Sequence, residues 1–102
     1  MTDITVQELK KRLDAGDNDF LFIDVREPHE YSEFNLGAKL IPLGNIMAAA
    51  DNELVDFKEK EIILHCRSGA RSGQAKQLLA MMGFTNVKNM LGGVLAWQEM
   101  VR

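Results

Sequence analysis

The chain has 102 residues, of which 46% are hydrophobic and 26% are charged, and its formal net charge at pH 7 is −3. This composition fits one small globular domain and argues against intrinsic disorder. The acidic balance does not favour nucleic acid or an anionic membrane as a partner, and no segment is apolar for long enough to predict a transmembrane helix.

The chain contains one cysteine, Cys66, so no disulfide can form within it. Its first residues, MTDITVQELKKRL, lack the apolar core of a secretory signal peptide. We therefore expect a single domain over residues 1–102 in a reducing cytoplasm.

The first half of the chain alternates helical and extended patterns. Thr5 and Glu8 have the spacing of a capping box, and the apolar residues that follow predict a helix over residues 6–15. The apolar run FLFI at 20–23, which ends at Asp24, is typical of a strand buried on both faces. A short helix, a short strand and a weakly patterned helical segment are then expected at residues 28–34, 37–42 and 45–57.

The second half continues this alternation. The run EIILH at 61–65 predicts a second buried strand, and apolar residues at helical spacing predict a helix over residues 73–82, with Ser72 as its N-cap. A short strand and a last helix are expected at residues 87–90 and 94–101.

Strands that alternate with helices predict an α/β fold, in which a parallel sheet is covered by helices on both faces. Ligands of such sheets bind beyond the carboxyl ends of the strands. Asp24 ends one predicted strand and Cys66 follows another, so we expect both residues at this edge.

The segment HCRSGARSG contains the only cysteine in a short turn with a local positive charge. Arg67 and Arg71 bring two cations near Cys66, Gly69 allows the backbone to bend, and the next helix begins close by. Such surroundings lower a thiol pKa from about 8.5 to between roughly 3.5 and 7.5, and the thiolate is the nucleophile. Most lone cysteines are inert and buried. A reactive Cys66 therefore requires a thiol that solvent can reach.

The length of the turn bears on what it binds. Four residues, RSGA, separate Cys66 from Arg71, whereas cysteine phosphatases place five residues between these two. Successive backbone N–H groups form a nest for anions, and this shorter nest better fits a single outer sulfur on Cys66 than phosphate or arsenate.

Four motifs, in order, resemble those of a single-domain rhodanese, a sulfurtransferase. They are IDVRE at 23–27, GAKLIP at 37–42, CRSGARS at 66–72, and a closing pattern at 83–97 that includes GF, LGG and a tryptophan. The family often has Gly-His-Ile before its Gly-Ala pair, where this chain has FNL at 34–36. The resemblance implies a rhodanese-like three-layer sandwich with a central parallel sheet.

The resemblance also implies a mechanism. The Cys66 thiolate would take the outer sulfur of a small anionic donor such as thiosulfate, and the resulting persulfide would pass sulfur to cyanide, a thiol or a partner protein. This is double displacement with ping-pong kinetics, and we expect no metal or organic cofactor. The residues expected to bind the persulfide and the substrate follow the cysteine: Arg67, Ser68, Gly69, Ala70, Arg71 and Ser72.

Other polar residues near the predicted edge have less direct roles. Asp24 and Arg26 are supporting candidates, and a structural pair between them is favoured over a contact of Asp24 with the loop or with Arg71. Ser68 is expected either to bond the donor or to stabilise the turn. His65 should point away from Cys66 and be packed. Two separated histidines and one cysteine do not predict a metal site.

Two alternative functions stay open at this point. The first is a catalytically silent rhodanese-like binding or regulatory module, although a cysteine in a complete basic loop favours an enzyme. The second is a cysteine phosphatase or arsenate reductase. The short loop disfavours phosphate, and a lone cysteine disfavours arsenate reduction by an internal thiol relay.

Overall fold

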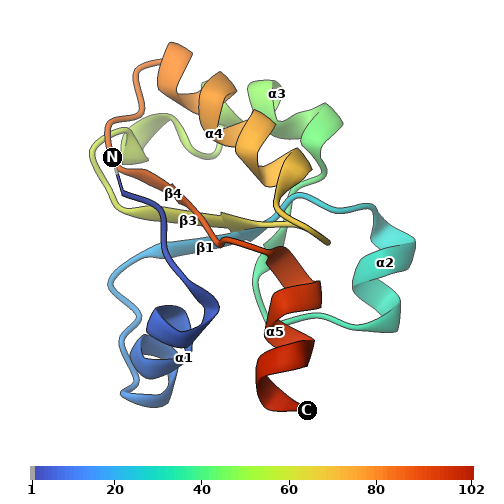
Figure 1. The fold of residues 1–102 in the computed structure, drawn as a ribbon. Helices are drawn as coiled ribbons and strands as arrows, with labels where there is room; N and C mark the ends of the chain where they lie inside the picture. The colour runs from blue at the N-terminus through green and yellow to red at the C-terminus, as the bar shows by residue number, and fades with distance from the viewer. Residues whose placement is uncertain (1) are drawn as a thin grey trace.

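The computed structural model describes residues 2–102 and contains a four-stranded, wholly parallel sheet with the strand order β2-β1-β3-β4 (Figure 1). The strands are β1 (Leu21–Asp24), β2 (Lys39–Leu40), β3 (Ile62–His65) and β4 (Val87–Asn89). The central pair is β1 and β3, in register from Leu21 opposite Ile62 to Asp24 opposite His65. The carboxyl ends of β1 and β3 therefore lie next to each other, with Asp24 beside the residue that precedes Cys66.

Helices cover both faces of this sheet, as Figure 1 shows. They are α1 (Val6–Asp14), α2 (Pro28–Glu33), α3 (Ile46–Asp51), α4 (Ala70–Met81) and α5 (Gly93–Val101). The pair α1 and α5 packs on one face, the pair α3 and α4 packs on the other, and α2 lies beyond the end of β1. This arrangement confirms the predicted α/β three-layer sandwich. No helix within residues 2–102 combines the length and the apolarity needed to span a bilayer.

The buried strand β3 and the cysteine that follows it supply side chains to both cores. Ile62, Leu64 and Cys66 join the cluster beneath α3 and α4, whereas Ile63 joins the cluster beneath α1 and α5. Successive side chains of a strand point to opposite faces, so His65 points away from Cys66, as predicted.

The capping box at the start of α1 is confirmed. The backbone N–H of Glu8 donates to Thr5 Oγ1 over 3.1 Å, and the N–H of Thr5 donates to Glu8 Oε1 over 3.0 Å. Most other predicted elements are present within a few residues of their expected bounds. The exceptions are residues 37–42, where only Lys39–Leu40 forms a strand, and residues 45–57, where α3 is followed by the 3-10 turn Val55–Phe57.

The prediction that Ser72 caps the helix after the cysteine is wrong. Helix α4 begins at Ala70, so Ser72 is its third residue and is buried. The N-cap is Gly69, whose φ is +103°. Glycine adopts this left-handed conformation without a steric penalty, and the chain can therefore turn into the helix directly after the cysteine loop.

The core on the α1 side should depend strongly on Leu9, which is fully buried in contact with residues from the sheet and α5. Leu9→Ala removes buried methyl groups and leaves a cavity, so we expect the free energy of unfolding to fall by about 2–5 kcal/mol. Urea denaturation measures this loss. The control is Leu95→Ala, since Leu95 is 43% exposed. Equal losses in the two variants would contradict the assigned packing.

Candidate active site

The cysteine loop is a turn between β3 and α4 whose backbone is held by α5. The carbonyl of Cys66 accepts a hydrogen bond from the N–H of Val94 over 2.9 Å, and the carbonyl of Arg67 accepts one from Leu95 over 3.0 Å. A Cβ atom on Gly93 would lie 2.5 Å from the Arg67 carbonyl oxygen, which is too close for any side chain. The glycine pair of the closing motif therefore allows α5 to begin directly against the loop.

The sulfur of Cys66 lies among hydrogen-bond donors of the loop and of the first turn of α4. The backbone N–H of Gly69 donates to Sγ over 3.1 Å, and the Ser72 hydroxyl lies 3.4 Å from Sγ. Burial is the largest single influence and raises the pKa of the Cys66 thiol. The Ser72 hydroxyl and the backbone N–H groups of Ser72, Gly69 and Ser68 together outweigh burial, so the pKa lies below its ordinary value.

Cys66 is also buried against apolar residues of the core beneath α3 and α4. Cys66 is 1% exposed, which is much less access than the sequence interpretation requires, whereas the neighbouring Arg67 and Ser68 are exposed. The expectation of an open thiol is therefore corrected: the cysteine follows a fully buried strand and packs in the core with it. We infer that a reagent reaches the sulfur only past the exposed residues of the loop.

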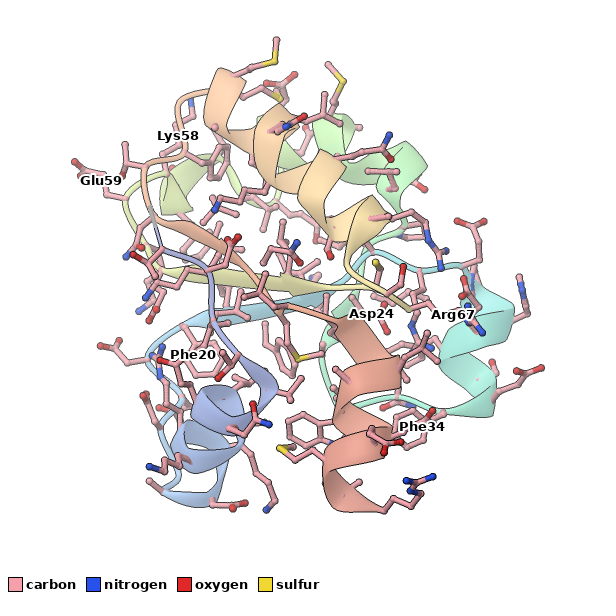
Figure 2. The ribbon with its side chains drawn as sticks, viewed as in Figure 1. Phe20, Asp24, Phe34, Lys58, Glu59 and Arg67 are labelled. Atoms are coloured by element: carbon pink, nitrogen blue, oxygen red, sulfur yellow. The ribbon has the colours of Figure 1, made fainter. Side chains whose placement is uncertain are left out.

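The two arginines of the loop have different surroundings. Arg71 forms a bidentate ion pair with Glu30 of α2, with N–O distances of 2.7 and 2.8 Å. Hydrogen bonds from Arg71 are the main reason that the pKa of Glu30 falls to about 2. Arg67 is exposed and forms no ion pair with a carboxylate of α2. It lines a cavity of about 250 Å³, and the other residues that line this cavity belong to α2, to α5 and to their flanks. Figure 2 shows Arg67 at the same end of the sheet as Asp24.

The expectation that two cations stabilise the sulfur anion is only partly met. Arg71 is close enough for the Cys66 sulfur to contribute to the raised pKa of Arg71, although Glu30 is the main cause of that rise. The lowered pKa of Cys66 comes from hydrogen-bond donors. Glu30 had no assigned role in the sequence interpretation, because its contact with Arg71 joins residues 41 positions apart.

Asp24 and Arg26 form a buried pair at the end of β1. The Arg26 side chain donates to both Asp24 carboxylate oxygens over 2.8–3.1 Å, and Arg26 Nη2 also donates to the Phe34 carbonyl over 2.6 Å. The pair of Asp24 with Arg26 is therefore present, and Arg71 binds Glu30 in place of Asp24. The pair anchors the segment after α2 to the edge of the sheet.

His65 is fully buried on the face opposite Cys66. Its ring packs against Phe22 with 5.2 Å between ring centroids, and its Nε2 lies 3.6 Å from Asp24 Oδ2. Neither ring nitrogen has a hydrogen-bond partner within residues 2–102. Burial is the main reason that the pKa of His65 is lowered, so the ring is neutral near pH 7. This placement fits a packed histidine and not a general base for Cys66.

Asn89 is a polar residue of the site that the sequence interpretation missed. Its Oδ1 accepts a hydrogen bond from the Ser72 hydroxyl over 2.6 Å, and its Nδ2 donates to the Gly69 carbonyl over 3.1 Å. The only signal in the sequence was its place near the end of the short strand predicted at residues 87–90. Elsewhere, no three His, Cys, Asp or Glu side chains of the described chain gather in a way that could hold a metal ion.

Comparisons with known proteins agree on one family. A family model described as a rhodanese-like domain matches residues 5–100. A sulfurtransferase of Allochromatium vinosum is 32% identical over 97 residues, which cover 95% of this chain and 88% of the relative. The chloroplastic thiosulfate sulfurtransferase 16 of Arabidopsis thaliana is 37% identical over 88 residues, which cover 76% of this chain and 73% of the relative. The structure of the human single-domain sulfurtransferase TSTD1 superposes with a TM-score of 0.80 at 26% identity, covering 95% of each chain.

Ser72→Ala removes the hydroxyl that lies beside the sulfur, so the pKa of Cys66 should rise and the thiolate fraction below that pKa should fall. We expect alkylation of Cys66 by iodoacetamide in this pH range to slow by roughly two- to tenfold, the effect of about one hydrogen bond. The rate is measured as a function of pH. Ser68→Ala is the control, because it keeps the backbone N–H through which Ser68 acts. An unshifted pH profile for Ser72→Ala would contradict the assigned role of the hydroxyl.

Proposed function

The chain belongs to the rhodanese-like domain family, and on this premise we propose that it moves a sulfane sulfur from a small anionic donor such as thiosulfate to a thiophilic acceptor through a persulfide on Cys66. The observation that carries this proposal is the set of hydrogen-bond donors around Sγ, from the loop backbone and Ser72. A thiolate carries its negative charge on Sγ, and a persulfide carries it on the outer sulfur bonded to Sγ. The same donors can therefore stabilise the nucleophile and the covalent intermediate.

The first half-reaction is a displacement at sulfur. The Cys66 thiolate attacks the outer sulfur of thiosulfate, a new S–S bond forms, and the bond between that sulfur and the sulfonate breaks. Sulfite leaves with the electron pair, and the negative charge of the thiolate passes to the outer sulfur of the persulfide. Arg67 is suited to attract the dianionic donor, because it is exposed on the loop and a guanidinium group binds oxyanions well.

The second half-reaction regenerates the thiolate. A nucleophile such as cyanide attacks the outer sulfur, the S–S bond breaks, and thiocyanate leaves while Cys66 recovers its electron pair. The chain has no second cysteine that could resolve the persulfide as an internal disulfide. The sulfur must therefore leave to a separate acceptor, a small thiol or a thiol of a partner protein.

One observation favours the alternative of a binding module without turnover. Cys66 is only 1% exposed, so a donor must approach through a nearly closed loop. A small anion that is attracted to the loop is the donor class best able to do so. The two functions differ in whether Cys66 acquires sulfur at all.

Incubation with thiosulfate followed by intact-mass measurement separates these functions. We expect the protein to gain the mass of one sulfur atom, to lose it on addition of cyanide with release of thiocyanate, and to show ping-pong kinetics in steady state. Cys66→Ser is the matched control and should gain nothing. No gain from thiosulfate, polysulfide or a low-molecular-weight persulfide would contradict the proposal and favour the binding module.

A further inference from the structure

Asn89 is held in one orientation by four hydrogen bonds. Its backbone N–H donates to Asp3 Oδ1 over 3.0 Å, and its carbonyl accepts from the N–H of Ile4 over 3.1 Å. Its Nδ2 donates to the Gly69 carbonyl over 3.1 Å, and its Oδ1 accepts from Ser72 over 2.6 Å. A carbonyl only accepts, so Gly69 must face the amide NH₂ group. The amide oxygen is thereby fixed toward the Ser72 hydroxyl.

The Ser72 hydroxyl has a single proton and two acceptors within reach. The Asn89 oxygen lies 2.6 Å from Ser72 Oγ, and the Cys66 sulfur lies 3.4 Å from it. While the sulfur is a neutral thiol, the proton belongs on the short bond to Asn89, and Ser72 Oγ can accept from the S–H group. When the sulfur carries a charge, it competes for the same proton through a stronger, charge-assisted bond.

If the Ser72 hydroxyl rotates to donate its proton to the sulfur, Asn89 loses a hydrogen bond. The residue is buried, so an amide oxygen that loses its donor is left without a hydrogen bond away from water. The gain at the sulfur is offset by this loss. The hydroxyl therefore stabilises the sulfur anion less than an unengaged serine would.

We propose that Asn89 is a positioning residue that competes with the Cys66 sulfur for the Ser72 hydroxyl proton and so limits how strongly the loop stabilises the sulfur anion. The competition follows from the hydrogen bonds alone. Its consequence for catalysis rests on the proposed function: Sγ regains the negative charge as the acceptor removes the outer sulfur, so a weaker hydrogen bond to Sγ slows this release.

The charged groups around this network belong to other residues than Asn89. Arg71 of α4 interacts electrostatically with the Cys66 sulfur and is bound to Glu30 of α2. Asp3 forms an ion pair with Lys76 of α4 beside the backbone of residue 89. Any change in the titration of Cys66 can therefore be assigned to the amide and the hydroxyl.

The test measures the rate of Cys66 alkylation by iodoacetamide against pH, in Asn89→Leu and in the smaller replacement Asn89→Ala. Both variants remove the competing oxygen. We expect alkylation below the Cys66 pKa to become roughly two- to tenfold faster, because the Ser72 proton is free to bind the thiolate. Asn86→Ala is the matched control, because it replaces another asparagine of the same segment. Its rate of Cys66 alkylation should equal that of the unmodified protein. Circular dichroism shows whether each variant folds.

The same replacements in a Ser72→Ala background separate proton competition from a merely structural role. Without the hydroxyl, Asn89→Leu and Asn89→Ala should leave the alkylation profile of Ser72→Ala where it is. If Asn89 acted only by holding the Gly69 carbonyl, its loss would loosen the Gly69 N–H that binds the sulfur. Alkylation would then become slower, whereas proton competition predicts faster alkylation. Slower or unchanged alkylation in folded Asn89 variants, or the same acceleration with and without Ser72, would overturn the proposal.

Sulfur loading is followed in parallel, so that this proposal and the proposed function can fail separately. Alkylation needs no sulfur donor. If the unmodified protein never gains sulfur, the proposed function fails, and the alkylation profiles still decide the proton competition. If it gains sulfur, persulfidated Asn89→Leu should release thiocyanate to cyanide faster than the unmodified protein, and slower release would contradict the catalytic consequence.

Discussion

The enclosure of one sulfur atom by the N–H groups of a very short turn is the constraint on which the rest of this structure depends. The turn is short because Gly69 adopts a left-handed conformation and α4 begins at the next residue. It is rigid because the first N–H groups of α5 bind the carbonyls of Cys66 and Arg67. Gly93 permits that approach, since any side chain there would overlap the loop. The closing glycine motif and the cysteine loop are thus one structural unit.

This enclosure has two opposite effects on the chemistry of Cys66. Burial alone would disfavour a charged sulfur, and the hydrogen bonds of the loop reverse that preference. Cys66 is nonetheless only 1% exposed, because it also packs in the core beneath α3 and α4. A site of this kind favours reactants that are small, anionic and able to react at a single outer atom. It disfavours groups that need several oxygens to be surrounded, as a phosphoryl group does.

Much of the fold could be predicted from local sequence patterns. Continuous apolar runs predicted β1 and β3, and the alternation of strands and helices predicted a parallel sheet covered on both faces. The cysteine loop could be predicted because its residues are contiguous. The burial of Cys66, the ion pair of Arg71 with Glu30, and the contacts of Asn89 could not, since each depends on where distant segments meet in space. The start of α4 was placed too late because Ser72 is a good N-cap by residue type, whereas the backbone freedom of Gly69 decides where this helix begins.

The most direct test of the enclosure is an NMR comparison of the ¹⁵N-labelled protein before and after treatment with thiosulfate. If the loop N–H groups bind the sulfur, the amide resonances of Gly69 and Ser72 should shift on treatment, because a hydrogen bond to a persulfide anion changes their proton shielding. The same resonances should stay in place in Cys66→Ser. A loaded protein whose Gly69 and Ser72 amides do not move would contradict the account, since the charged sulfur would then lie outside the turn.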